Sequence, residues 1–233
     1  NNLGVAFYKK NFFDEAKEYF EKALAIEPNY AVAKRNLEAS MKKDLIFKEA
    51  IEKLKERLKE EPQNSSIYYD LANAYRSTGH LKEAIVQYKK VIEIDPSNVD
   101  AVNNIGLTFL QTGDNDNAIK AFIEVISRDS KNDRAHFHLA MSYLKKEWWE
   151  EAETEFHKAL ELNPELKESY FRLGDVYRRK GWWDEAIDMW RRYITEEPDT
   201  ETARAAQENI RMIEVWKKEL QLSPSSSRKK IIK

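Results

Sequence analysis

Polar side chains that can hydrogen-bond a peptide recur along this sequence at intervals of 34 residues. We call a set of residues spaced by 34 a column, and this column consists of Asn2, Asn36, Asp70, Asn104, His138 and Arg172. An asparagine amide offers N–H donors and a carbonyl acceptor, so it can pair with both polar groups of a peptide bond. A row of such side chains has the chemistry to hydrogen-bond the backbone of an extended peptide. The alternative is that asparagine is simply common at this position of a repeated unit.

The column one residue earlier becomes aromatic toward the C-terminus. Its members are Asn1, Arg35, Tyr69, Asn103, Phe137 and Phe171. Leu107, Met141 and Leu144 are predicted to face the same surface. Aromatic side chains carry much of the energy of peptide and protein interfaces, so this surface predicts an apolar binding site. The alternative is that the rings pack between neighbouring helices.

No group of side chains predicts a catalytic, metal-binding or cofactor-binding site. The chain has four histidines and no cysteine. His136 and His138 stand two apart on one predicted helix, so they point to different faces and do not readily share a metal ion. Neither His80 nor His157 has ligand partners at metal spacing, and no glycine-rich phosphate loop is present. We therefore predict a protein that is not an enzyme and uses no metal or cofactor.

The elements that must position these columns follow the same period. One column holds proline at Pro28, Pro62, Pro96, Pro164 and Pro198, and its remaining position within this range is Ser130. A further column is entirely alanine, at Ala16, Ala50, Ala84, Ala118, Ala152 and Ala186. A fixed period of this length indicates one structural unit that is stacked several times.

Apolar residues within each unit are spaced by three, four and seven, which predicts two amphipathic helices. The first, helix A, is expected at 31–44, 65–78, 99–112, 133–146 and 167–180. The second, helix B, is expected at 48–61, 82–95, 116–129, 150–163 and 184–197. Gly79, Gly113 and Gly181 would end helix A, because glycine adopts a left-handed backbone at the lowest cost. The proline would end helix B.

This pattern resembles the tetratricopeptide repeat family, which stacks 34-residue helix–turn–helix units. The resemblance covers residues 1–200 and implies an all-α, right-handed superhelical solenoid of six repeats. The repeats would span 1–30 (truncated at its start), 31–64, 65–98, 99–132, 133–166 and 167–200. The second repeat departs most, with Glu38 at the small-residue position, Leu45 at the turn glycine and Arg57 in place of alanine. We expect a looser helix pair there.

The pattern changes after the last proline of the period. Residues 201–222 keep an apolar helical stripe but lose the repeat signature, and the resemblance implies a capping helix. Met212 and Val215 lie beside that stripe and would serve either broader packing or contact with a partner. Residues 223–233 are rich in serine and basic residues, which predicts a flexible basic tail.

The resemblance also implies a function, because A helices of the family line a concave groove that holds peptides or partner helices. Some members clamp a C-terminal carboxylate with lysine, asparagine and arginine side chains. The nearest matches here are Tyr69, Asn73, Asn104, Arg134 and His138, in which the tyrosine and the histidine depart from the pattern. We predict a protein-interaction scaffold that binds a peptide in the groove. A self-assembling scaffold and the substrate-recruiting arm of a larger enzyme remain alternatives.

Charge is segregated in the last two repeats. Helix A carries +2 at 133–146 (three basic residues, one acidic) and +3 at 167–180 (five basic, two acidic). Helix B carries −4 at 150–163 (one basic, five acidic) and −3 at 184–197 (two basic, five acidic). An inner surface that includes Arg134 and Arg172 favours an acidic ligand or a terminal carboxylate. Incidental bias between two solvated faces is the alternative.

The composition favours protein or peptide partners. The 233 residues carry a net charge of −2, so no global basic field would attract nucleic acid. No apolar run approaches the roughly 18 residues that a membrane span requires. The chain begins at Asn1, inside a predicted helix, so we expect the native N-terminus upstream, and the cytoplasm is only the default expectation for its compartment.

Overall fold

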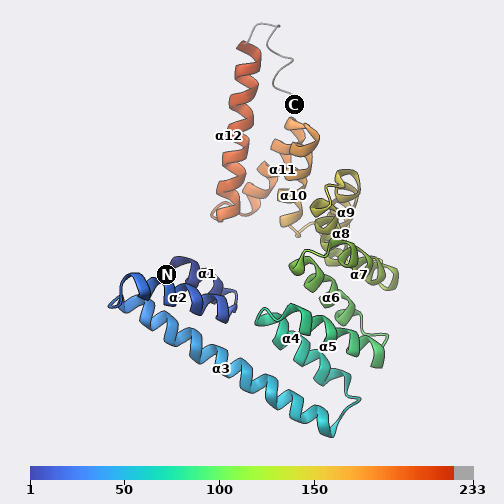
Figure 1. Ribbon diagram of the computed structural model, residues 1–233. Coiled ribbons are helices and arrows are strands. Elements are labelled where there is room, and N and C mark those ends of the chain that lie inside the picture. The colour runs from blue at the N-terminus through green and yellow to red at the C-terminus, as the bar shows by residue number, and fades with distance from the viewer. Residues whose placement is uncertain (223–233) are drawn as a thin grey trace. The chain divides into compact units, whose positions relative to one another are not determined.

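The computed structural model describes residues 1–222, and the tail predicted at 223–233 lies outside them. The chain forms two compact units, Asn1–Arg128 and Asp129–Lys233. All regular structure within residues 1–222 is α-helical, as predicted, and no strand occurs there (Figure 1). Unit 1 contains α1 (Asn2–Lys9), α2 (Phe13–Ile26), α3 (Ala31–Glu60), α4 (Ser65–Ser77), α5 (Leu81–Ile94), α6 (Val99–Thr112) and α7 (Asn115–Arg128). Unit 2 contains α8 (Asp133–Lys145), α9 (Trp149–Leu162), α10 (Glu168–Lys180), α11 (Trp183–Glu196) and α12 (Glu201–Leu222).

Ten of these helices form hairpins in which a helix A packs on the helix B that follows it. The pairs are α1–α2, α4–α5 and α6–α7 in unit 1, and α8–α9 and α10–α11 in unit 2. The alanine column lies where the helices cross, and Ala16, Ala84, Ala118, Ala152 and Ala186 are fully buried. At Gly174 an added Cβ atom would lie 2.4 Å from Nε1 of Trp190, so no larger residue fits unless the indole moves.

The turns inside these hairpins share a residue with a left-handed backbone. It is Asn11, Gly79, Gly113, Glu147 or Gly181, with φ between 60° and 84°. All five fall on one column of the 34-residue period. Glycine holds three of the five positions because it lacks the Cβ atom that opposes this conformation. The remaining member of the column is Leu45.

The structure corrects the helix pair that the sequence predicts at 31–64. Residues 31–60 form one unbroken helix, α3, instead of helices at 31–44 and 48–61 (Figure 1). Leu45 replaces the turn glycine, and neither glycine nor proline occurs between residues 31 and 60, so the local sequence favours continuation. Across the expected turn, Lys48 pairs with Asp44 at 2.6 Å, four residues earlier, which stabilises the helix further.

A single buried stripe also runs the length of α3. Its buried and half-buried members are spaced by three or four residues: Ala33, Leu37, Ser40, Asp44, Phe47, Ile51, Leu54 and Leu58. Because the stripe keeps its phase through the expected turn, one face of α3 packs on both α2 and α4. Outside the stripe, Met41, Leu45 and Ile46 are more than half exposed. Ala50 is exposed too, unlike the five buried alanines of its column.

The helix predicted at 201–222 is present as α12, which packs on α11. Ala203 and Ile210 occupy columns that are largely buried in the earlier A helices, and both are buried. The columns that would face a following helix B hold Gln207, Glu208 and Arg211, and all three are exposed. We propose that α12 caps the array, because it keeps contacts with the preceding hairpin and presents polar residues where another helix would pack.

Candidate functional site

Part of the predicted polar column is hydrogen-bonded within unit 1. Asn36 Nδ2 donates a 3.0 Å hydrogen bond to Asn1 Oδ1. Asn104 Nδ2 donates a 2.7 Å hydrogen bond to the Tyr69 hydroxyl. Asn36 thus links α3 to the residue before α1, and Asn104 links α6 to α4. Each bond uses one N–H of the amide, so each asparagine keeps some capacity for a ligand.

Asn73 and Asn103, the other predicted amides of unit 1, have different surroundings. The Tyr88 hydroxyl on α5 donates a 2.5 Å hydrogen bond to Asn73 Oδ1, which ties α4 to its own helix B. Asn103 Oδ1 is buried and has no hydrogen-bond partner among the described residues. A buried acceptor without a donor is costly, and because this atom is closed to solvent, a ligand N–H would reach it only after neighbouring side chains moved.

The aromatic residues predicted to anchor a ligand lie in the core of unit 2. Phe137 and Phe171 are only 7% and 9% exposed. Phe137 contacts Phe156 of α9, and Phe171 contacts Tyr193 of α11, each pair with ring centroids 5.6 Å apart. This burial favours the alternative interpretation of the column, in which the rings pack between helices.

Arg134, His138 and Met141 lie along α8. Arg134 is exposed, whereas His138 and Met141 are half-buried. Burial is the main cause that lowers the pKa of His138 to about 4; Glu168 raises it and Arg134 lowers it by smaller amounts. The imidazole is therefore neutral near pH 7, and it is a poor substitute for the arginine of a carboxylate clamp.

A hollow opens between α8, α10 and the start of α9, and we call it the α8–α10 pocket. Its volume is about 280 Å³. Its lining residues are Met141, Leu144, Lys145, Glu147, Trp149, Arg172, Asp175, Arg178 and Arg179. The apolar side chains come from α8 and α9, whereas α10 contributes three arginines. The pocket thus joins three residues predicted for the binding surface, Met141, Leu144 and Arg172, with several that were not predicted.

The arginines of the pocket are incompletely paired. Arg172 forms ion pairs with Glu168 at 3.1 Å and Asp175 at 3.8 Å. The Nε atoms of Arg172 and Arg178 are nevertheless buried without a hydrogen-bond partner among the described residues. Burial raises the pKa of Asp175, and the arginines, Arg179 included, oppose that effect. Four basic and two acidic lining residues leave the pocket with a net charge of +2.

Sequence reasoning missed Trp149, Asp175, Arg178 and Arg179 as members of one site. A signal was nevertheless present in the period. Leu144 and Arg178 are 34 residues apart, so they occupy equivalent positions on neighbouring A helices. The same spacing that aligned the polar column therefore places these side chains on one surface.

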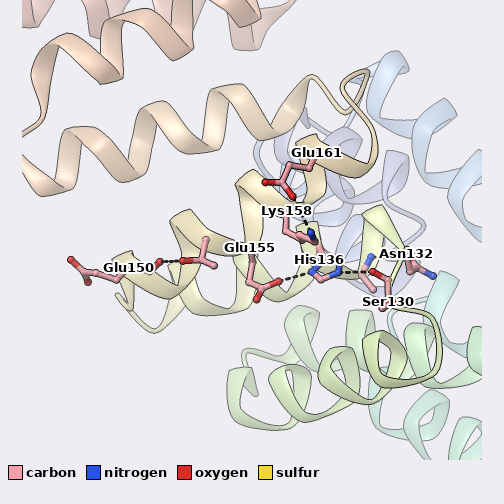
Figure 2. A network of polar contacts seen from close by, with 9 residues as sticks. Ser130, Asn132, His136, Glu150, Glu155, Lys158 and Glu161 are labelled. Carbon is pink, nitrogen blue, oxygen red and sulfur yellow. Dashed lines mark hydrogen bonds and ion pairs between the residues drawn. The ribbon is translucent and has the colours of Figure 1, made fainter.

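His136 has a structural role in unit 2. The ring is only 6% exposed, and Figure 2 shows it between Glu155 and Ser130. Nδ1 lies 2.6 Å from Glu155 Oε2, and Nε2 donates to the Ser130 carbonyl at 3.3 Å. His136 therefore links α9 to the segment before α8, at Ser130, the position where the other repeats carry proline. No cluster of three or more histidine, aspartate or glutamate side chains suited to a metal ion is found in residues 1–222.

Helix hairpins that cross at small residues and share a left-handed turn define a helical-repeat protein. This chain belongs to the tetratricopeptide repeat family. Models of that repeat match residues 1–30, 99–132, 133–166 and 156–188, and a TPR repeat model matches residues 72–113. The matched ranges leave out residues 31–71, which contain α3. No curated protein sequence matches the chain significantly.

Several solved structures resemble the chain at low sequence identity. Residues 41 to the end of MamA from Desulfovibrio magneticus RS-1 are 22% identical, with a TM-score of 0.63, and the match covers 72% of this chain and 94% of that one. YrrB, a TPR protein with an unusual peptide-binding site, is 20% identical, with a TM-score of 0.62 and coverage of 82% and 99%. A chain of the APC/C hetero-tetramer Cut9–Hcn1 is 16% identical, with a TM-score of 0.61, and the match covers 91% of this chain and 41% of that one. At these identities the likeness establishes the fold alone. Within the described part of the chain, no helix has both the length and the apolar character of a membrane span.

Proposed function

We propose that this chain is a non-catalytic interaction scaffold that binds a peptide or protein segment along the A helices of its repeats. Membership of the tetratricopeptide repeat family supports this proposal, as does the likeness to YrrB, a TPR protein with a peptide-binding site. The observation that carries it here is the α8–α10 pocket, a basic hollow on the A helices of unit 2 whose arginines are only partly paired.

The charge of unit 2 indicates what kind of segment would bind. Two cations near the ends of α10 are held by acidic residues in or beside the B helices. Lys180 pairs with Glu153 of α9 at 2.6 Å, and Lys167, just before α10, pairs with Glu197, just after α11, at 3.2 Å. The cations that line the pocket remain on the A-helix side. A hollow of one charge sign concentrates ligands of the opposite sign. We therefore expect an acidic segment to bind better than a basic one.

Fluorescence anisotropy with labelled peptides capped at both ends tests this proposal. An acidic peptide should bind, whereas a peptide of the same length with lysine in place of each glutamate should not. The affinity of the acidic peptide should fall as the salt concentration rises, because salt screens part of the attraction. The double variant Lys145→Glu/Arg179→Glu should lose binding. The control Arg192→Glu changes an exposed cation of α11 and should bind normally. Equal binding of both peptides, or an unaffected double variant, would contradict the proposal.

Self-association is a second candidate, and the exposed apolar side chains of α3 favour it. Met41, Leu45 and Ile46 stand uncovered on a helix whose counterpart in the other repeats is a closed hairpin. Sedimentation velocity at increasing protein concentration should then show a growing mass that Met41→Glu/Leu45→Glu abolishes. A constant monomer mass would eliminate this candidate.

A further inference from the structure

The exposed face of α3 has a charge pattern that is complementary to itself when a second α3 runs in the opposite direction. We propose that two copies of this chain pair through antiparallel α3 helices, centred between Leu45 and Ile46. This inference rests on the second proposed function, self-association, and it specifies the orientation and the register of the two helices.

One stripe of α3 is exposed along most of the helix, and we call it the outer stripe. Its members all lie within about 100° of one another around the helix axis. They are Arg35, Glu38, Lys42, Leu45, Ile46, Glu49, Lys53 and Glu56, and each is exposed. The outer stripe lies opposite the buried stripe that packs on α2 and α4, so these two helices leave it uncovered.

The outer stripe is symmetric about a centre between residues 45 and 46. At equal distances on the two sides of this centre stand residues of opposite charge. The charged pairs are Arg35 with Glu56, Glu38 with Lys53, and Lys42 with Glu49. Leu45 and Ile46 form the central pair, and each is 56% exposed. Two antiparallel helices place equidistant positions opposite each other, so every charge of the outer stripe would face its opposite. A parallel pair would instead place each charge opposite its own copy.

The closed repeats support this register. Glu38 and Lys53 occupy the columns of Gly106 and Ala121. A Cβ atom added to Gly106 would lie 3.2 Å from the Cβ atom of Ala121, so these two columns meet where α6 crosses α7. In α3 both columns belong to one straight helix, in which they lie about 22 Å apart at 1.5 Å per residue. A second copy in the antiparallel register brings them together again.

Most charges of the outer stripe have no ion pair within their own chain. The ion pairs of α3 join Lys48 to Asp44, Lys55 to Glu52 and Lys59 to Glu56. Among the described residues, Glu56 is thus the only member of the outer stripe with an ion pair within 4 Å. The other charges can pair with a second copy without breaking an ion pair.

The apolar centre and the charges contribute differently to this pairing. Covering Leu45 and Ile46 removes apolar surface from water, which favours association. Exposed ion pairs add little to affinity, but they select the orientation and the register of two helices. We therefore expect a reversible dimer whose affinity falls as the salt concentration rises.

Reversal of one charge pair tests the register, with sedimentation velocity at rising protein concentration as the assay. Lys42→Glu and Glu49→Lys each place like charges opposite one another at two symmetric points of the dimer. Each variant alone should dimerise about 10-fold more weakly than the unmodified chain, or weaker still. An equimolar mixture of the two should recover the affinity, because every charge of this pair then faces its opposite. The control Lys82→Glu changes an exposed lysine of α5 and should dimerise normally.

A single spin label tests the orientation. Lys59 is exposed and lies outside the outer stripe, and the chain has no cysteine, so Lys59→Cys can be labelled at one site. In the antiparallel dimer the two labelled residues lie on opposite sides of the centre, about 40 Å apart along the helices. A parallel pair would set the labels roughly 10–20 Å apart. Pulsed electron paramagnetic resonance distinguishes the two distances.

The outcomes separate this inference from self-association as such. A constant monomer mass would refute both. The chain could instead associate while Lys42→Glu and Glu49→Lys dimerise normally, while their mixture is no tighter than either variant, or while the Lys59 labels lie close together. Any of these three results would refute the antiparallel pairing and leave self-association through another contact. Circular dichroism shows that each variant is folded.

Discussion

The continuity of α3 is the structural result that departs furthest from the repeat pattern, and a distance measurement tests it directly. Lys34 and Arg57 are exposed and lie 23 residues apart on this helix. At 1.5 Å per residue, an unbroken helix places their Cα atoms about 35 Å apart. A closed repeat would set the same two residues side by side on paired helices whose axes are about 8–10 Å apart. Spin labels should then be separated by roughly 10–20 Å.

Pulsed electron paramagnetic resonance on the variant Lys34→Cys/Arg57→Cys separates these two arrangements. The chain contains no cysteine, so the labels attach only at the chosen sites. Labelled chain is refolded with an excess of unlabelled chain, so that only distances within one molecule are measured. We expect one distribution centred near about 35 Å. The matched control is Asp70→Cys/Lys89→Cys, which spans the α4–α5 hairpin and should give a short distance. A short distance in the α3 variant would refute the argument that the missing turn glycine and the unbroken buried stripe keep this helix straight.

Four substitutions test other parts of the fold. Glu147 and Leu45 share one column, yet glycine should act in opposite directions at the two positions. Glu147→Gly should stabilise the protein because φ is 60° there, and Leu45→Gly should destabilise it by about 1 kcal/mol because residue 45 is helical. Urea denaturation in which both variants changed the free energy of unfolding in the same direction would contradict this. Gly174→Ala should cost about 1–3 kcal/mol, because the new Cβ meets the Trp190 indole, and an unchanged melting temperature would show that the indole can move. The pKa of His138 is lowered to about 4 from an ordinary 6.5, so between these values the unfolded chain binds a proton that the folded chain does not. Stability should fall as pH drops through that window, by at most about 3 kcal/mol from this group, and less in His138→Gln; equal pH profiles would contradict the assignment.

The hairpins could be predicted from the sequence because their determinants are local and repeated. The buried alanines and Gly174 fix where two helices cross, and a left-handed residue fixes each turn. The failure at 31–64 has an equally local cause. Leu37, Ala50 and Leu54 kept the apolar pattern of a repeat, so they predicted two helices, but that pattern does not form a turn. At Leu45 the turn residue is missing, and the buried stripe of α3 continues through it.

The candidate site was harder to predict, because a column identifies a surface but not the partners of its side chains. Phe137, Phe171 and Tyr69 share a column, and each contacts an aromatic ring of its own helix B, that of Phe156, Tyr193 and Tyr88 respectively. The two phenylalanines are buried, whereas Tyr69 is only half-buried. Whether a ring faces the ligand or the next helix depends on the side chains of helix B. A column within helix A carries no information about those residues. The predictions from aromatic residues were therefore weaker than those from turns.

Hydrogen-bonding capacity distinguishes the asparagine column of unit 1 from the α8–α10 pocket of unit 2 more sharply than residue type does. Asn36 and Asn104 match the peptide-binding column, but each already donates one amide hydrogen to a neighbouring residue. A peptide that binds there must use the remaining donor and acceptor, or replace a bond that the protein already makes, and a replaced bond adds little net free energy. At the α8–α10 pocket, Arg172 and Arg178 each hold a buried Nε that makes no hydrogen bond within the described chain. Those atoms are closed to solvent, so a carboxylate would meet the outer guanidinium nitrogens, which in Arg172 already pair with Glu168 and Asp175. Arg178 has no such ion pair among the described residues, so binding there would break none. The strongest recognition is therefore expected from α10, where the sequence singled out Arg172 and showed Arg178 and Arg179 only as a charge bias.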